Sequence, residues 1–373
     1  MSFCAYYDTE QCRSCAWIDL SYADQLKNKT AQLHELLDPF EPHEWLKPSP
    51  SSVKGFRNKA KMVASAGSEG VTLGLSEETS LIGCPLYPEP MQRALEVIQQ
   101  WLRELGIKPY EVKKKKGELK YVLLTRSTFE GSMMLRFVLR SHGVIPRLQK
   151  GLDELLQSLP ELKVVTVNIQ PVHMAILEGE EEIYLTETKR IEERFNGIPL
   201  YIRPKSFFQT NPEIAAKLYK TASEWAGNPS VVWDLFCGTG GFALHCMKEG
   251  RKVIGIEIEP EAIECARDSA EAMGIEGLTF RALDAASFRI EAEGRPDVLI
   301  VNPPRRGLGE QLCKWVSKVA PETIVYSSCN AQTLARDLEM LDEYRIGKVQ
   351  LFDMFPHTGH YEVLCLLEKS PLS

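Results

Sequence analysis

The spacing of apolar residues changes near residue 201 and gives the chain two different patterns. Beyond that point, continuous apolar runs alternate with segments whose apolar positions repeat every three or four residues. The periodic segments predict helices, and the runs predict buried strands at 231–235, 251–258, 278–285, 297–304 and 322–329. This alternation indicates an α/β domain with a doubly wound parallel sheet.

The end of the chain departs from that alternation. Residues 345–355 and 360–369 both have a strand pattern, and only a short turn separates them. A connection this short has no room for a crossover helix, so we expect a hairpin with an antiparallel last strand.

Residues 51–200 have a mixed, strand-rich pattern. It predicts strands at 55–65, 118–127, 132–141 and 162–171 and amphipathic helices at 91–106 and 144–160. We therefore expect three parts. They are residues 1–85 with a cysteine-rich start and a basic strand, an α+β domain at 86–200, and the α/β domain at 201–373.

Composition is that of an ordinary globular protein, with 44% hydrophobic and 25% charged residues. No apolar run is long enough to cross a bilayer, and the first residues, MSFCAYYDTE, have no features of a signal peptide. We expect a cytoplasmic protein without membrane association. No sequence feature indicates a protein partner.

Charge is unevenly distributed along the chain. Residues 51–150 contain 17 Lys and Arg against 9 Asp and Glu, although the net charge of the whole chain is −7. A basic region in an acidic protein is typical of a polyanion bound on one face, and a solvated lysine-rich surface is the alternative.

A glycine-rich turn follows the strand at 231–235. Gly238, Gly240 and Gly241 in VVWDLFCGTGGF allow the backbone to approach a ligand at the carboxyl edge of a parallel sheet. The G-x-G-x-x-A spacing also fits a dinucleotide, and Glu257 stands where a carboxylate would hold ribose hydroxyls. A nicotinamide-dependent oxidoreductase is therefore one alternative.

Unusual polar residues stand at three further strand ends: Asn302 before two prolines, Cys329, and Glu362 in HTGHYE. A terminal antiparallel hairpin separates methyltransferase sheets from dehydrogenase sheets, so the glycine turn is interpreted as a methyl-donor site. A thiol and a carboxylate beside it suggest methylation at carbon of a pyrimidine. The thiolate would add to C6 of uracil to activate C5, and the carboxylate would then remove the C5 proton.

The ten cysteines differ in their sequence surroundings, which suggest different roles for them. Cys4, Cys12 and Cys15 form a C-x7-C-x2-C pattern, and Cys84 is followed directly by proline. Three close cysteines and a distant fourth suggest an iron–sulfur cluster with four thiolate ligands. Zinc is the alternative, although structural zinc sites usually contain two C-x2-C pairs. We expect five others to be small core residues, namely Cys237, Cys246, Cys265, Cys313 and Cys365.

Several motifs resemble those of the RNA 5-methyluridine methyltransferases that use S-adenosyl-L-methionine. The matching stretches are SFFQTN, LFCGTGGF, NPPRRG, YSSCNAQTLARD and DMFPHTGHYE. The resemblance covers the whole domain at 201–373 and implies a class I methyltransferase fold. It also implies Cys329 as the nucleophile and Glu362 as the base, with adenosylmethionine contacts from Gln209, Phe236, Glu257 and Asn302.

The cysteines resemble the four ligands of a [4Fe–4S] cluster that some members of this family carry, namely Cys4, Cys12, Cys15 and Cys84. Some members also have a small RNA-binding β-barrel ahead of the first cysteine, which is not expected here because that cysteine is residue 4. This combination resembles the members that modify 23S ribosomal RNA. The implied partner is that RNA or a ribosomal assembly intermediate, held by the α+β domain at 86–200 with the help of the basic residues in 51–150. Another ribosomal or transfer RNA uridine is the alternative substrate.

Overall fold

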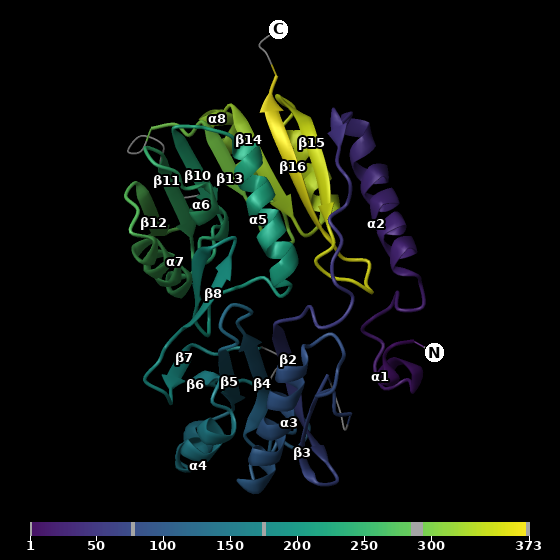
Figure 1. Cartoon of the computed structure of the whole chain (residues 1–373), viewed down its shortest axis with the longest axis vertical. Coiled ribbons are helices and arrows are strands. Elements are labelled where there is room, and N and C mark those ends of the chain that lie inside the picture. Colours follow the sequence, from purple (N-terminus) through teal and green to yellow (C-terminus); the bar gives the residue numbers. More distant parts are fainter. Residues whose placement is uncertain (1, 76–78, 174–176, 285–293, 371–373) are drawn as a thin grey trace. The chain divides into compact units, whose positions relative to one another are not determined.

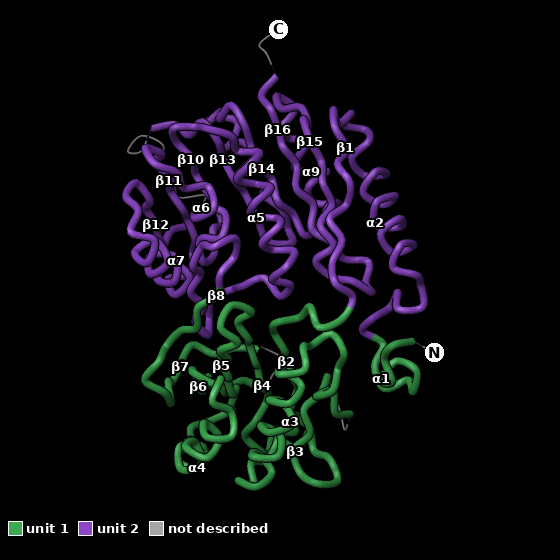
Figure 2. Tube along the Cα trace, in the orientation of Figure 1, with its two compact units in different colours: residues 1–13, 54–193 green, residues 14–53, 194–373 purple. Residues whose placement is uncertain are grey.

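The computed structural model describes residues 2–75, 79–173, 177–284 and 294–370. The last residue of the strand predicted at 278–285 lies outside these ranges. The chain forms two compact units (Figure 2). Unit 1 contains residues 1–13 and 54–193, and unit 2 contains residues 14–53 and 194–373.

These units differ from the three parts expected from the sequence pattern. Residues 59–74 pair with the strands that follow them in one sheet, so residues 54–85 share a core with the expected central domain. Residues 14–53 instead pack in unit 2, where Leu33 and Leu37 are buried in its core. Local patterning could not reveal either assignment, because both depend on contacts between residues far apart in sequence.

Unit 2 is built on an eight-stranded sheet in the order β1-β15-β16-β14-β13-β10-β11-β12 (Figure 1). Its strands are β1 (Glu44–Trp45), β10 (Val231–Leu235), β11 (Lys252–Glu257), β12 (Leu278–Ala282), β13 (Val298–Val301), β14 (Thr323–Ser328), β15 (Tyr344–Phe352) and β16 (Glu362–Lys369). Its helices are α2 (Tyr22–Leu37), η1 (Asp38–Phe40), α5 (Pro212–Ala226), α6 (Gly241–Cys246), α7 (Pro260–Met273), α8 (Gly309–Val319) and α9 (Ala331–Met340). A separate two-stranded sheet contains β8 (Ile191–Phe195) and β9 (Ile198–Ile202).

The predicted terminal hairpin is confirmed. β16 lies between β14 and β15 and is antiparallel to both, whereas β10 to β14 pair in parallel. Parallel strands align their carboxyl ends along one edge, and an antiparallel strand brings its first residue to that same edge. Glu362, which begins β16, is therefore placed beside the residues that follow β14.

The core of unit 2 explains why its strands have continuous apolar runs. Trp233, Ile254, Leu299 and Ile324 from four strands pack in one cluster with α8 and α9 residues. Each of these four side chains is fully buried, as expected for a sheet covered by helices. The five cysteines expected in the core are all buried.

Unit 1 is a mixed α+β unit with a six-stranded sheet in the order β3-β2-β4-β5-β6-β7. Its strands are β2 (Lys59–Gly67), β3 (Gly70–Gly74), β4 (Leu119–Arg126), β5 (Met133–Leu139), β6 (Leu162–Ile169) and β7 (Glu181–Tyr184). Its helices are α1 (Ala5–Asp8), α3 (Glu89–Glu104), η2 (His142–Val144) and α4 (Ile145–Ser158). Helices α3 and α4 contribute to the same apolar cluster as the sheet. None of the described helices is long and apolar enough to cross a membrane.

Candidate functional site

The glycine turn after β10 has an unusual backbone. Phe236, Gly238 and Gly240 all have positive φ angles, of 62°, 54° and 85°. A Cβ on Gly240 would approach the ring of Phe280 to 2.9 Å, so glycine is required there. A Cβ on Gly238 would meet nothing within 4 Å. The turn therefore has open space beside Gly238, as a loop that receives a ligand would.

Asp234 lies directly beneath this turn. Its Oδ2 accepts a hydrogen bond from the backbone N–H of Ala243 at 2.9 Å, which fixes the first turn of α6. Its other oxygen has no hydrogen-bond partner among the described residues. Complete burial raises the pKa of Asp234 well above its usual value. The sequence alone does not indicate that one oxygen of this acid is left without a partner.

Glu257 is brought to the same turn by the pairing of β10 with β11. One of its carboxylate oxygens accepts from the N–H of Gly238 at 3.1 Å. The other accepts from the N–H groups of Ile258 at 2.7 Å and Glu259 at 3.1 Å. The carboxylate is thus held at the strand edge, next to the open side of the glycine turn.

Asn302 and Gln209 complete the predicted donor-binding set. Asn302 follows β13, and its N–H donates to the carbonyl of Leu235 at 3.4 Å, so it lies next to the end of β10. Gln209 is buried in the loop before α5. Among the described residues, no hydrogen bond joins Gln209 to Phe236, Glu257 or Asn302. The strand pairings thus bring three of the four predicted residues to one edge, and Gln209 belongs to a separate loop.

The predicted nucleophile and base lie on neighbouring strands. Cys329 follows β14 directly, Glu362 begins β16, and Ser328 pairs with Val363 between them. Glu362 is only 3% exposed, and the Ser327 hydroxyl donates to its Oε1 at 2.8 Å. Burial raises the pKa of Glu362 to about 7, and the hydrogen bond from Ser327 opposes that rise. A carboxyl with this pKa can accept a proton near neutral pH.

The Cys329 thiol is half-buried, and its neighbours include groups that raise its pKa and one that lowers it. Burial is the largest cause that raises its pKa, and the nearby Glu362 carboxylate raises it further. The charge of Arg305 and a hydrogen bond from its side chain act to lower the same pKa. The sequence did not indicate this contact, because Arg305 and Cys329 are 24 residues apart.

A cavity of about 530 Å³ opens beside Cys329. It is lined by Arg305 and by residues 329–332 and 359–361, which follow β13, β14 and β15. Helix α2 also lines it through Gln32, Glu35 and Leu36. The N-terminal helix of unit 2 is therefore part of the wall around the predicted nucleophile, which the sequence did not indicate.

Three of the four predicted cluster ligands gather in unit 1. Cys4 is buried, and Cys12 and Cys84 pack against the apolar cluster of that unit. The N–H of Gly83 donates to the Tyr6 hydroxyl at 3.2 Å, which ties the two cysteine segments together. Burial raises the pKa of Cys84 to about 11, and Cys4 and Cys12 add to that rise.

The fourth predicted ligand, Cys15, belongs to the part of the chain assigned to unit 2. Across the described ranges, no group of three or more His, Cys, Asp or Glu side chains is arranged to hold a metal ion. The iron–sulfur cluster therefore stays a prediction.

The basic residues of unit 1 differ in exposure. Lys113 to Lys116 form an exposed turn, in which Lys114 pairs with Glu111 at 2.6 Å. Lys61 is exposed on β2. Lys59 is instead half-buried, and burial lowers the pKa of its ammonium group. The turn at 113–116 is therefore the clearest candidate surface for phosphates.

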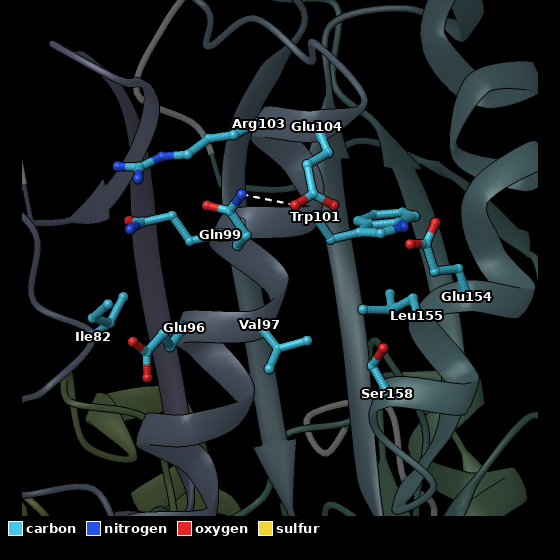
Figure 3. A pocket seen from close by; sticks show the side chains of 11 residues that line it. Ile82, Glu96, Val97, Gln99, Trp101, Arg103, Glu104, Glu154, Leu155 and Ser158 are labelled. Atoms are coloured by element: carbon cyan, nitrogen blue, oxygen red, sulfur yellow. Dashed lines mark hydrogen bonds between the residues drawn. The ribbon is translucent and has the colours of Figure 1, made fainter.

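A second depression, of about 460 Å³, lies on unit 1 between α3 and α4 (Figure 3). Several of its polar groups already have partners, inside the depression or beside it. Gln100 donates to Glu104 at 2.7 Å, Arg103 pairs with Glu69 at 2.8 Å, and Gln99 accepts from the N–H of Leu73 at 2.8 Å. It contains no thiol and none of the predicted site residues, so it is a groove between packed helices.

Comparison with known proteins shows the family to which this chain belongs. The family model described as tRNA (Uracil-5-)-methyltransferase matches residues 21–370. A protein of Shewanella loihica named 23S rRNA (uracil(747)-C(5))-methyltransferase RlmC is 54% identical, and the alignment covers 98% of this chain and 99% of that protein. A protein of the same name from Salmonella paratyphi B is 52% identical, over 98% and 99% of the two chains.

A solved structure supports the same placement. The tRNA (uracil-54, C5)-methyltransferase of Pyrococcus abyssi, in complex with S-adenosyl-L-homocysteine, superimposes with a TM-score of 0.80. It is 29% identical, and the match covers 95% of this chain and 85% of that one. The similarity therefore includes elements of both units.

Proposed function

The chain belongs to the tRNA (uracil-5-)-methyltransferase family, and from that membership we propose that its substrate is uridine 747 of 23S ribosomal RNA. It is an S-adenosyl-L-methionine-dependent RNA uracil-C5 methyltransferase. Relatives more than 50% identical over nearly the whole chain are named for position 747. Family membership and the antiparallel β16 both argue against the nicotinamide-dependent alternative.

One observation carries the proposed chemistry: the Cys329 thiol and the Glu362 carboxyl lie at one sheet edge, close enough for the carboxylate charge to raise the pKa of the thiol. In the proposed reaction, the Cys329 thiolate adds to C6 of uracil and electron density moves to C5. C5 then takes the methyl group from the sulfonium of the donor, which leaves as S-adenosyl-L-homocysteine. Glu362 removes the C5 proton, the C5–C6 double bond re-forms, and the thiolate leaves.

Each step has a matching feature in the protein. Arg305 stabilises the thiolate form of Cys329, because its positive charge and its hydrogen bond both lower the pKa of the thiol. The buried Glu362, with a pKa of about 7, is basic enough to take a proton and acidic enough to release it afterwards. The target uridine must leave its base stack to reach Cys329, and the cavity there gives it space.

The methyl donor is proposed to bind at the ends of β10, β11 and β13. Glu257 would accept hydrogen bonds from ribose hydroxyls, and Phe236 and Asn302 would contact the cofactor from the ends of β10 and β13. The open space beside Gly238 and the unpaired buried oxygen of Asp234 support a polar ligand at this turn. Gln209 is the fourth proposed contact, from the loop before α5.

We also propose a [4Fe–4S] cluster held by Cys4, Cys12, Cys15 and Cys84. Four thiolates are the usual donor set for this cluster, and three of these cysteines gather in unit 1. When bound, it would supply a covalent crosslink between segments that are far apart in sequence, and thus stabilise the fold. Zinc on the same thiolates stays the alternative.

The RNA is proposed to contact the exposed turn at Lys113 to Lys116. Lysines bind phosphates as point charges and add affinity without sequence preference. Selection of the uridine would then depend on the cavity at Cys329.

The function can be tested by mapping 5-methyluridine in ribosomal and transfer RNA from a strain that lacks this chain. We expect the modification at position 747 of 23S RNA to disappear. The intact gene should restore it, and a gene encoding Cys329→Ala should not. Loss of 5-methyluridine at a different position would leave the reaction standing and assign another substrate.

A further inference from the structure

A fully buried ion pair joins α2 to the segment that connects β15 with β16. Lys29 Nζ lies 2.6 Å from Asp353 Oδ1, and neither side chain is exposed. Lys29 also donates to the carbonyl oxygen of Phe355 at 3.0 Å. The Tyr22 hydroxyl donates to the second oxygen of Asp353 at 2.8 Å. Helix α2, which runs beside the β1 and β15 edge of the sheet (Figure 1), thus holds the start of this connection.

Gln25, one helical turn before Lys29, holds the middle of the same connection. Its side-chain oxygen accepts from the N–H of His357 at 2.7 Å. Its Nε2 donates to the carbonyl of Trp17 at 2.9 Å, and the N–H of Trp17 donates to the carbonyl of His357 at 2.9 Å. Because His357 has a φ of 65°, its backbone adopts a conformation that needs such support.

The connection between β15 and β16, which α2 holds, leads directly to the proposed reaction site. Residues 353–361 connect Phe352 to Glu362, and these two residues pair across the hairpin. Gly359, His360 and Tyr361 form part of the cavity wall beside Cys329. Further along α2, Gln32 and Glu35 line the same cavity. The same helix therefore fixes the connection and borders the space into which the uridine enters.

A contribution to stability alone does not account for this arrangement. A buried ion pair can often be replaced by apolar residues of similar size with little loss of stability, because its desolvation cost offsets its attraction. Its directional hydrogen bonds can instead specify one conformation of a loop that has several polar contacts.

We propose that Lys29 and Gln25 are positioning residues for proton removal by Glu362. They hold residues 353–361 so that the Glu362 carboxyl and the cavity wall keep their places relative to Cys329. This inference rests on the proposed role of Glu362. Disturbing either residue should slow the base-dependent step more than attack by Cys329 or binding of adenosylmethionine, whose proposed contacts lie on other strands.

The test compares four variants of the full chain on RNA that contains 5-tritiated uridine. Lys29→Met leaves Asp353 unpaired, and the double variant Lys29→Met/Asp353→Leu removes both charges. Gln25→Leu removes the hydrogen bond to His357 but keeps the ion pair. Lys27→Met, on an exposed position of the same helix, is the control.

The measurements are tritium release, the covalent protein–RNA fraction on a denaturing gel, adenosylmethionine affinity and Tm. We expect Gln25→Leu and both Lys29 variants to lower kcat about tenfold or more and to raise the covalent fraction. Adenosylmethionine affinity should stay within about twofold, and Lys27→Met should match the wild type. The double variant should regain the Tm that Lys29→Met loses, without regaining kcat.

Two results would overturn the inference. One is recovery of kcat together with Tm in the double variant, which would make the ion pair a purely structural element. The other is a normal kcat and covalent fraction in Gln25→Leu, a result available even if the Lys29 variants do not fold. Glu362→Gln, run in parallel, separates the two hypotheses. If Glu362→Gln does not accumulate covalent RNA, the assignment of Glu362 as the base is wrong. If Glu362→Gln accumulates covalent RNA and the Lys29 and Gln25 variants do not, only the positioning role is wrong.

Discussion

The Ser327 hydroxyl donates a 2.8 Å hydrogen bond to Oε1 of Glu362 from the neighbouring antiparallel strand. This bond favours the charged carboxylate, whereas burial of the group favours the neutral acid. The balance gives Glu362 a pKa of about 7, well above the 4.5 of an ordinary glutamate. The pKa of the proposed base is therefore set by the hydrogen bond from Ser327 and by the burial of Glu362 at the start of β16.

The turnover rate should increase as pH rises through about 7. Glu362 must be deprotonated to accept the C5 proton, and its raised pKa places that change near neutrality. Cys329 also has a raised pKa, so the rate should continue to increase at more alkaline pH. Initial rates of tritium release between pH 5.5 and 9 test this, with adenosylmethionine affinity measured at each pH. A rate that does not change between pH 6 and 8 would contradict the assignment.

Ser327→Ala should move the lower midpoint of that pH profile upward. Removing the hydrogen bond takes away the interaction that favours the carboxylate, so the pKa of Glu362 should increase by about 1 unit. At pH 7 the variant should be several-fold slower, and at pH 9 it should approach the wild-type rate. Ser317→Ala on α8 is a control remote from the proposed base. An unchanged midpoint would mean that Ser327 does not influence the reacting group.

The sequence predicted the large sheet well because its signals are local. The central strands β11, β13 and β14 each contain an apolar run, and the short turn after β15 permits only a hairpin. Cys329 and Glu362 were identified because polar residues at strand ends are conspicuous there. Their placement at one edge follows from the strand order.

Other features depend on contacts that no local pattern contains. Lysine is a residue type that is seldom buried without a partner, and the pairing of Lys29 with Asp353 explains its burial. The division at residues 13 and 53 has the same origin, since α2 packs in the core of unit 2. The contact of Arg305 with Cys329 joins two loops that are 24 residues apart.

Cys84→Ala should abolish iron binding. The protein purified without oxygen should be brown and contain iron and sulfide, because four thiolates would hold one cluster. Removing one ligand should eliminate the colour and lower Tm, since ligation connects distant segments. Cys313→Ala, at a buried position on α8, is the control and should keep the colour. Stoichiometric zinc without iron in the wild type would establish the alternative metal.

Neutralising the exposed turn should weaken RNA binding and reduce its salt dependence. Each phosphate contact contributes about 0.7 to the slope of log K against log salt for single-stranded nucleic acid. Lys113→Gln/Lys116→Gln should therefore reduce the slope by about 1.4. The control is Lys314→Gln/Lys318→Gln on the exposed side of α8. Equal slopes for the wild type and the Lys113/Lys116 variant would show that this turn is only a solvated surface.

The two proposed catalytic roles can be separated by their effect on covalent RNA. Cys329→Ala removes the group that attacks C6, so no adduct should form and methylation should stop. Glu362→Gln keeps the size and polarity of the side chain but removes the base. Attack and methyl transfer can then still occur, and the C5 proton should leave about 10² to 10⁴ times more slowly.

Glu362→Gln should therefore accumulate protein, methyl group and RNA as one covalent species. A denaturing gel should show a shifted band for this variant when adenosylmethionine is present, and a labelled methyl group should appear in that band. Cys329→Ala should show no such band, and the double variant should behave like Cys329→Ala because attack precedes proton removal. Normal turnover by Cys329→Ala would remove the thiol from the mechanism. Normal turnover by Glu362→Gln would keep the thiol and require a different base.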